Sequence, residues 1–460
     1  MKETLAPKDI IKSGLCIGCG SCVAQNKALE ARMEFDPYGQ LKPKGSRQFL
    51  QTPSSQFTLT CPFSPAAKNE NELAAERYPA APHTDGYIGR FTQSYIGYVA
   101  TGGFRMQGSS GGMVSWVAAE LMRRGLIDGV AHVVPADPEK DGRFFKFRIS
   151  RSLEAINQGA QSRYYPIDMS EILEEIRQVP GRYAIVGIPC FIKAVHLLRR
   201  EDPVLQERIV YTLGLFCGHM KSARFVESFA WQMDVPIEDV TQVAYRTKHP
   251  ERPANWYNAR LTLKDGSSVN KDWWHLADGD WGAGYFMNPA CNFCDDVVGE
   301  TADISFGDAW IEPYASDSGG NNVVVIRHAL VQQMIEEGIA HGDLHLTPVD
   351  AATVVQTQAA GFRQRREGMA YRLSWGNKGV QPIKRLPPDA LTPTRNRKLI
   401  YRMRYWISEG SHRFFHLARK TGKPNIYIKW ARMAAAMYHA LAYQRGKLGK
   451  LVQKLKLTDA

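Results

Sequence analysis

The sequence predicts a mixed α/β protein in three parts: a small cysteine-rich domain, a larger α/β core and a basic helical tail. Three observations support this class. Cysteines recur with C-x2-C-x2-C spacing near the start, strand-like and helix-like segments alternate through the middle, and the last stretch is rich in lysine and arginine. The expected boundaries are residues 1–80, 87–385 and 391–460.

The first part is organised around Cys16, Cys19 and Cys22, with glycines between them. This spacing lets consecutive sulfurs reach neighbouring corners of one inorganic cube, and the glycines let the backbone curl around it. A bacterial ferredoxin would have its next cysteine at position 26, where this chain has Asn26. Cys61, which precedes a proline, is therefore the expected fourth ligand of a ferredoxin-like iron-sulfur domain.

Two other roles for these thiols remain open. A structural zinc site also uses thiolates, although zinc knuckles are normally built from two C-x2-C pairs rather than a triplet. Disulfides are the less favoured alternative, because the first residues contain no apolar secretory segment. A reducing, cytoplasmic location is expected.

In the core, an expected strand at 94–100 precedes the sequence Gly108-Ser109-Ser110-Gly111-Gly112, which opens a helix through 113–122. Free backbone N–H groups at such a helix start favour an anion, here the phosphates of a bound nucleotide. Ordinary turn and cap chemistry explains the same pattern equally well. A further strand is expected at 130–134.

Two later strands end at cysteines. The segment 182–187 leads into Pro189 and Cys190, and 209–215 leads into Cys217. Sheets of this class bind ligands at such strand ends, although inert core cysteines are also common. Because the pair Cys291 and Cys294 lacks two ligands, the eight cysteines divide into two sets of four without remainder. The predicted sets are Cys16, Cys19, Cys22 and Cys61, and Cys190, Cys217, Cys291 and Cys294.

Three further side chains are candidates for the chemistry. Asp308 lies in the segment 301–310, which with the run 323–326 is expected to complete the core. It would hydrogen-bond a cofactor or substrate, or simply form a turn. His219 lies beside an expected ligand, and Tyr164 or Tyr165 precedes a polar helix at 169–178. His219 and Tyr164 are candidate proton donors, with a purely structural role as the alternative.

The net charge of +12 is concentrated in the tail. Residues 391–460 contain sixteen lysines and arginines against Glu409 and Asp459, so the rest of the chain is nearly neutral. Helices are expected at 395–407 and 426–443, the second with Ile426, Trp430, Met433, Met437 and Ala440 toward one face. Peripheral contact with an anionic membrane, docking of an acidic ferredoxin, or packing on the body would each explain this pattern. Nucleic-acid binding is not expected, because the body shows no nucleic-acid-binding pattern.

Seven motifs follow one another along the chain: Cys-Ile-Gly-Cys-Gly-Ser-Cys, Thr-Cys-Pro-Phe, Gly-Ser-Ser-Gly-Gly, Val-Gly-Ile-Pro-Cys, Leu-Phe-Cys-Gly-His, Cys-x-x-Cys-Asp and Ala-Asp-Ile-Ser-Phe-Gly-Asp-Ala-Trp. In this order they make the chain resemble the β subunit of the coenzyme F420 (8-hydroxy-5-deazaflavin) hydrogenase/dehydrogenase family over about residues 10–330. The family also includes 7-hydroxymethyl chlorophyll a reductase and divinyl chlorophyllide 8-vinyl reductase.

The resemblance implies FAD and one or two 4Fe-4S clusters. Ser109, Ser110, Gly111 and Gly112 would then lie along the FAD, and the Pro189 turn would lie near its ring. The chain departs from the family pattern at Gln25-Asn26, where a Cys-Pro is usual, and keeps only Cys61-Pro62 of a second ferredoxin repeat.

The expected function is that of an iron-sulfur flavoprotein oxidoreductase. Electrons would pass from ferredoxin, or another one-electron donor, through two 4Fe-4S clusters to FAD and on to a small organic substrate. The alternative is an electron-transfer β subunit that reduces or oxidises a deazaflavin coenzyme for a hydrogenase or dehydrogenase partner. A third alternative is a zinc-stabilised binding module without redox chemistry. The protein would be cytoplasmic, or peripheral on the inner face of the cell membrane if the tail contacts lipid.

Overall fold

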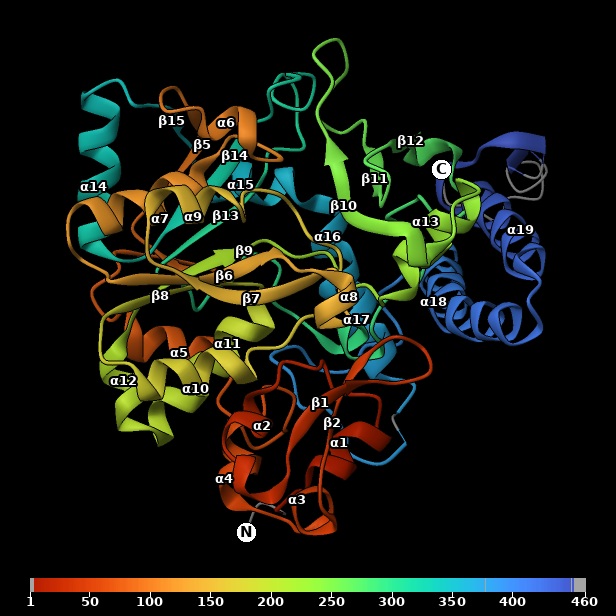
Figure 1. Cartoon of the computed structure of the whole chain (residues 1–460), viewed down its shortest axis with the longest axis horizontal. Coiled ribbons are helices and arrows are strands. Elements are labelled where there is room, and N and C mark those ends of the chain that lie inside the picture. The colour runs from red at the N-terminus through yellow and green to blue at the C-terminus, as the bar shows by residue number, and fades with distance from the viewer. Residues whose placement is uncertain (1–3, 377, 448, 451–460) are drawn as a thin grey trace.

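The computed structural model describes residues 4–376, 378–447 and 449–450. Its largest sheet has eight strands in the order β15-β5-β14-β13-β9-β8-β6-β7, with helices on both faces (Figure 1). The strands are β5 (Gln93–Val99), β6 (Gly129–Pro135), β7 (Phe145–Ser150), β8 (Tyr183–Gly187), β9 (Ile209–Leu215), β13 (Ile304–Asp308), β14 (Asn322–Ile326) and β15 (Leu344–Pro348). This mixed sheet confirms the predicted α/β class.

Four central strands, β6, β8, β9 and β13, run parallel. The outer strands β7, β14, β5 and β15 are each antiparallel to the neighbour on which they pair. All strands that the sequence predicts in this region are confirmed. Because parallel strands end at a common edge, the residues that follow β8, β9 and β13 are brought together there.

Side chains along β8 alternate between two apolar cores, as period-two geometry requires. Tyr183 and Ile185 pack on one face of the sheet, and Ala184 and Val186 on the other. The first face is covered by α10 (Ser170–Gln178), α11 (Pro189–Glu201) and α12 (Pro203–Arg208), and the second by α7 (Met113–Arg123) and α14 (Ala329–Ala340). The helices predicted to begin after Gly112 and near 169 are confirmed as α7 and α10.

The cysteine-rich N-terminal part packs beneath the sheet in the view of Figure 1. Its elements are α1 (Pro7–Lys12), α2 (Ser21–Ala24), β1 (Arg32–Phe35), β2 (Leu41–Lys44), α3 (Arg47–Gln51), α4 (Ser55–Thr60) and α5 (Glu70–Arg77). Ile17 and Phe57 belong to the same buried apolar cluster as Phe191 and Ile192 of α11. The N-terminal part therefore shares one core with the body.

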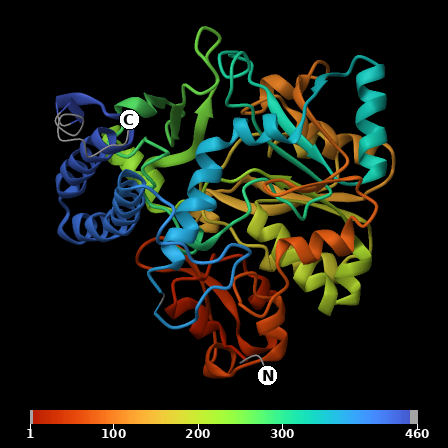
Figure 2. The same cartoon turned by 180° about the vertical axis from the view of Figure 1, so that it is seen from behind.

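Shorter elements connect these layers. They are β3 (His83–Asp85), β4 (Gly89–Phe91), α6 (Phe104–Gln107), α8 (Pro138–Asp141), α9 (Leu153–Asn157), α15 (Ala351–Thr357), α16 (Ala359–Arg365) and α17 (Glu367–Leu373). Figure 2 shows the light-blue segment that holds α16 and α17 between the sheet and the blue C-terminal helices. This position allows α16 to contribute to the site described below.

A second apolar core lies beside the large sheet. It joins α13 (Arg224–Gln232) and the antiparallel sheet β10 (Val240–Thr247), β11 (Asn258–Leu263) and β12 (Ser268–Asp272) to the long helices α18 (Arg395–Thr421) and α19 (Pro424–Tyr443). The two helices confirm the predicted helical tail, and their apolar side chains pack on the body. None of the helices in the described ranges is both long and apolar enough to span a bilayer.

The predicted face of the second tail helix is wrong in part. Trp430 and Ala440 are buried, but Met433 and Met437 are 51% and 42% exposed. The buried stripe consists instead of Tyr427, Trp430, Ala431, Ala434, Tyr438 and Ala440. The helix carries apolar residues around much of its circumference, so periodicity alone does not define which stripe faces the body.

Candidate functional site

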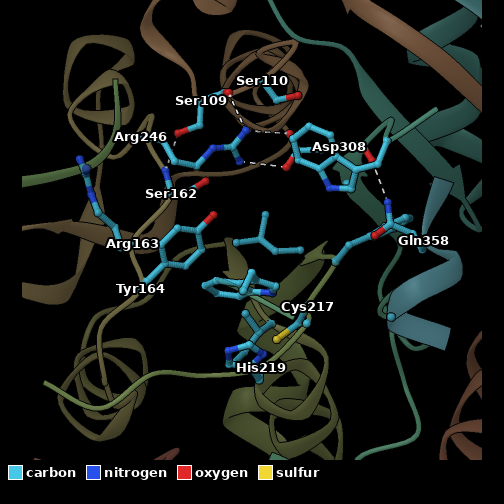
Figure 3. Close-up of a pocket in the computed structure, with 18 of the residues that line it drawn as sticks. Ser109, Ser110, Ser162, Arg163, Tyr164, Cys217, His219, Arg246, Asp308 and Gln358 are labelled. Atoms are coloured by element: carbon cyan, nitrogen blue, oxygen red, sulfur yellow. Dashed lines mark hydrogen bonds and ion pairs between the residues drawn. The ribbon is translucent and has the colours of Figure 1, made fainter. Parts of the chain in front are cut away.

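A cavity of about 1020 Å³ lies at the edge of the sheet where the parallel strands end. Gly187, Phe216 and Asp308, at or just after the ends of β8, β9 and β13, contribute to its wall. Figure 3 shows Ser109, Ser110, Arg246 and Asp308 at one end and Cys217 and His219 at the other. Cys217 and Asp308, two of the side chains predicted at the strand ends, thus line one space.

The Gly/Ser loop forms the first end of the cavity. Ser109, Ser110 and Gly112 line it, whereas Gly111 does not. A Cβ at Gly111 would lie 2.7 Å from the carbonyl oxygen of Gly97, so this glycine allows the loop to pack on β5. Gly112 has φ +86° and caps the start of α7, which is a backbone conformation that suits glycine.

Arg246 of β10 fills the space beside this loop. Its Nη1 lies 2.9 Å from Oδ2 of Asp308, and its Nη2 donates to the carbonyl oxygen of Ser109 at 3.2 Å. The guanidinium also lies over the rings of Tyr257, at 4.3 Å, and Trp310, at 5.5 Å. Burial lowers the pKa of Arg246, but Asp308 together with Tyr257 and Tyr164 more than offsets this, so that the pKa lies well above its usual value. Asp308 is therefore an ion-pair partner in the cavity wall.

Aromatic side chains form the middle of the cavity. Tyr164 packs against Trp281 with ring centroids 4.7 Å apart, and also contacts Trp273 and Tyr245. Burial raises the pKa of Tyr164, so its hydroxyl stays protonated. Tyr165 also lines the cavity and packs among Phe35, Phe144 and Phe145.

His219 is 3% exposed at the other end of the cavity, stacked on Trp281 at 4.2 Å. Its Nδ1 lies 3.3 Å from Nη2 of Arg404 on α18, and its buried Nε2 has no hydrogen-bond partner among the described residues. Because a guanidinium only donates, Nδ1 accepts and Nε2 carries the hydrogen. Burial, together with the charges of Lys221 and Arg404, lowers the pKa of His219 well below its usual value. The ring is therefore a neutral hydrogen-bond donor.

The first predicted cysteine set comes together in the N-terminal part. Burial raises the pKa of Cys22 and of Cys61, and charges on their neighbours raise both further. These neighbours are Cys16, Cys19 and Cys61 for Cys22, and Cys16 and Cys19 for Cys61. Gly18 has φ +81°, and a Cβ there would lie 2.6 Å from the carbonyl oxygen of Leu41, so the loop requires glycine.

The second set also comes together, beside the first. Burial raises the pKa of Cys190, and charges on Cys294, Cys217, Cys291 and Cys19 raise it further. The last of these belongs to the first set. Met220 N–H donates to Cys291 Sγ at 3.3 Å, a contact that favours a thiolate. Within the described ranges, however, no three histidine, cysteine, aspartate or glutamate side chains form a site for a single metal ion. Ligation by these cysteines stays a prediction.

The residues fit a positively charged iron–sulfur core. In each set, burial and the charges of neighbouring thiolates oppose ionisation, so a cationic occupant is needed to hold several thiolates together. Positively charged side chains also lie beside both cysteine sets. Lys42 Nζ donates to the carbonyl oxygen of Cys16 at 2.6 Å, and Arg365 Nη2 lies 3.6 Å from Cys217 Sγ. Arg365 is 3% exposed and also donates to the carbonyl oxygens of Gly218 and Asp296.

The sequence analysis places one site residue wrongly and misses three others. Pro189 is the first residue of α11 and does not line the cavity, which Gly187 and Ile188 do instead. Arg246, Arg365 and Arg404 come from elements far from the cysteine motifs, and no local spacing marks them. Only the Trp-rich segment near Trp281 carries a compositional signal that would have pointed to the cavity.

Comparison with known proteins places the chain in one family. Two family models describe the N-terminal and the C-terminal part of the coenzyme F420 hydrogenase/dehydrogenase beta subunit, and they match residues 94–174 and residues 181–352. The chain belongs to this family. Membership confirms the predicted resemblance and the general class of oxidoreductase electron-transfer subunits. The matched ranges contain the Gly/Ser loop and the second cysteine set, and they leave out the first set and α18–α19.

Two individual proteins are similar to this chain over part of their length. One subunit of the F(420)H(2) dehydrogenase of Methanosarcina mazei is 24% identical over 317 residues, which is 65% of this chain and 77% of that protein. A chain of the F420-reducing [NiFe] hydrogenase complex from Methanosarcina barkeri, solved as a xenon derivative, is 16% identical. That similarity covers 64% of this chain and 96% of the other, with a TM-score of 0.49.

Proposed function

We propose that this member of the family carries electrons between a hydrogenase or dehydrogenase partner and a deazaflavin coenzyme. The observation that carries the proposal is the succession of the two cysteine sets and the cavity. Cys19 of the first set influences the pKa of Cys190 in the second, and Cys217 of the second set lines the cavity. The coenzyme class comes from the family description, which names coenzyme F420.

Cys16, Cys19, Cys22 and Cys61 would hold one 4Fe-4S cluster, and Cys190, Cys217, Cys291 and Cys294 a second. FAD would occupy the cavity, whose volume of about 1020 Å³ is at the upper end for a cofactor site. When bound, the clusters would supply one-electron transfer, and the flavin would collect two electrons for transfer as a hydride.

The chain's own side chains would bind and shield these groups. Arg365 places a buried positive charge beside Cys217 and favours its thiolate. Arg246, held by Asp308, fixes the Gly/Ser loop through the carbonyl oxygen of Ser109. Tyr164 and Trp281 would form an aromatic wall that excludes water from the bound ligand.

A free-standing, ferredoxin-dependent reductase of a small organic substrate is the second proposal. It shares the cysteine sets and the cavity with the first and differs in electron donor and acceptor. Contact of the tail with a membrane also stays a prediction, since α18 and α19 bury much of their apolar surface against the body.

Anaerobic purification with iron, acid-labile sulfide and flavin analysis tests the cofactors. We expect about eight irons and about eight sulfides per chain, flavin, and a broad absorbance near 400 nm. Reduced deazaflavin coenzyme should bleach that absorbance faster than reduced ferredoxin does. Bound zinc without iron would refute the proposal, and faster reduction by ferredoxin would favour the second one.

A further inference from the structure

The end of the cavity nearest the C-terminal helices carries an excess of positive charge. Cationic side chains that line the cavity here are Lys221, Arg363, Arg397, Arg404 and Arg445. None of them forms an ion pair with a carboxylate within the described part of the chain. Three of them, Arg397, Arg404 and Arg445, come from α18 or follow α19, outside both family matches.

The carboxylate that lines this end, Asp280, is already engaged. Its Oδ2 lies 2.8 Å from Nε2 of His439, and its Oδ1 accepts from the backbone N–H of Gly282 at 2.7 Å. The hydroxyl of Tyr443 also donates to Oδ1 at 3.5 Å. Within the described residues Asp280 pairs with His439 and forms no ion pair with an arginine.

Arg404 is the buried arginine of this group, with 8% of its surface exposed. Its Nη2 donates to His219 Nδ1, and among the described residues its only other side-chain contact of this kind is with Met287 Sδ at 4.0 Å. Gly284 makes room for it, because a Cβ there would lie 3.0 Å from Arg404 Nε. A buried guanidinium without a carboxylate is costly, which implies that an anion completes its surroundings.

A second, independent feature points to a ligand at the same place. The Nε2–H of His219 is a buried donor without a partner among the described residues, and His219 lines the cavity beside Arg404. Lys221 is 1% exposed, and its Nζ donates to the carbonyl oxygen of Tyr285 while it lies over the ring of Trp281. Guanidinium, imidazole and ammonium donors thus converge next to an aromatic wall.

We infer that this end of the cavity binds the anionic group of an organic ligand, either a carboxylate or a phosphate. Arg404 supplies the buried charge, His219 an unpartnered Nε2–H donor, and Arg397 and Arg445 the charged rim. A guanidinium fork matches both kinds of anion in a bidentate arrangement. The C-terminal helices therefore complete a binding site rather than only cover the body. This inference requires neither bound clusters nor bound flavin.

Isothermal titration calorimetry of the anaerobically purified full chain tests the inference. The probes are inorganic phosphate and tricarballylate, titrated at constant ionic strength. We expect saturable binding of at least one probe, and the tighter of the two identifies the class of anion. Arg404→Gln should weaken that binding tenfold or more, because a charge-assisted hydrogen-bonded contact is lost.

Arg413→Gln is the matched control, since Arg413 lies on the same helix with a side chain 74% exposed and pairs with Glu409. The Arg413→Gln variant should bind the anionic probe with the same affinity as the wild type. The double variant Arg397→Gln/Arg445→Gln tests the rim and should also weaken binding of the anion. If Arg404→Gln does not fold, this double variant tests the inference in its place. Absence of saturable binding, or equal affinity in all the variants, would overturn the inference whether or not the cofactors are present.

Discussion

Replacing Asp303 by asparagine should destabilise the protein substantially. Asp303 is fully buried at the start of β13 and accepts from Arg77 of α5 at 2.9 Å on each oxygen. It also accepts from the backbone N–H and the hydroxyl of Thr212, both at 2.7 Å, and from Tyr78 Oη at 3.2 Å. This carboxylate joins the N-terminal part to two strands of the central sheet.

Two considerations set the magnitude. Burial raises the pKa of Asp303, but Arg77 and the hydrogen bonds prevail and lower it from 3.8 to about 2. At about 1.4 kcal/mol per pKa unit, the charged form contributes about 2 kcal/mol. Because Arg77 also loses its partner, we expect Asp303→Asn to lower the free energy of unfolding by about 2–4 kcal/mol.

The pH dependence has a definite sign. A carboxylate with a lowered pKa stabilises the fold above its unfolded value and loses this effect as the pH falls through about 2. The difference in unfolding free energy between the wild type and Asp303→Asn should therefore shrink below about pH 4.

Urea unfolding followed by tryptophan fluorescence measures this difference, with midpoints compared at equal m-values. Asp128→Asn is the control, because Asp128 and Arg182 form a comparable pair with side chains 49% and 51% exposed. Such a surface pair contributes about 0–1 kcal/mol. If Asp303→Asn costs no more than Asp128→Asn, the reasoning from burial is refuted.

Three further predictions concern the proposed cofactors. Gly18→Ala should remove about four of about eight irons, because a Cβ at Gly18 would lie 2.6 Å from a backbone oxygen. Gly266→Ala is the control: Gly266 also has a positive φ, +83°, but a Cβ there meets no other atom, so this variant should keep all the irons. Arg365→Met removes a positive charge beside Cys217 and should make the midpoint potential of one cluster more negative in an EPR redox titration. Arg365→Lys keeps the charge and should shift the potential less, and an unchanged potential in Arg365→Met would contradict the proposed charge effect. Arg246→Met should reduce flavin content but not iron content, and a parallel loss of both would indicate misfolding instead.

Local signals were sufficient for most secondary structure near the site. A continuous apolar run marks β8, and the glycines before Met113 mark the start of α7. These features depend on a few consecutive residues, so they can be read without knowledge of the rest of the fold. Counting the thiols also predicted the two sets of cysteines, and mutual effects on pKa place members of each set near one another.

The amino-acid order alone therefore defines the sheet strands, the Gly/Ser turn and the two groups of thiols. The tertiary structure determines which charged side chains lie beside these strands, this turn and these thiols. Arg246 and Asp308 are 62 residues apart in the chain, Arg365 and Cys217 148 residues, and Arg404 and His219 185 residues. No local period or turn rule connects such pairs, because their proximity depends on how distant helices pack on the sheet. The basic tail, which by charge alone resembles an appendage, becomes part of the cavity wall for the same reason.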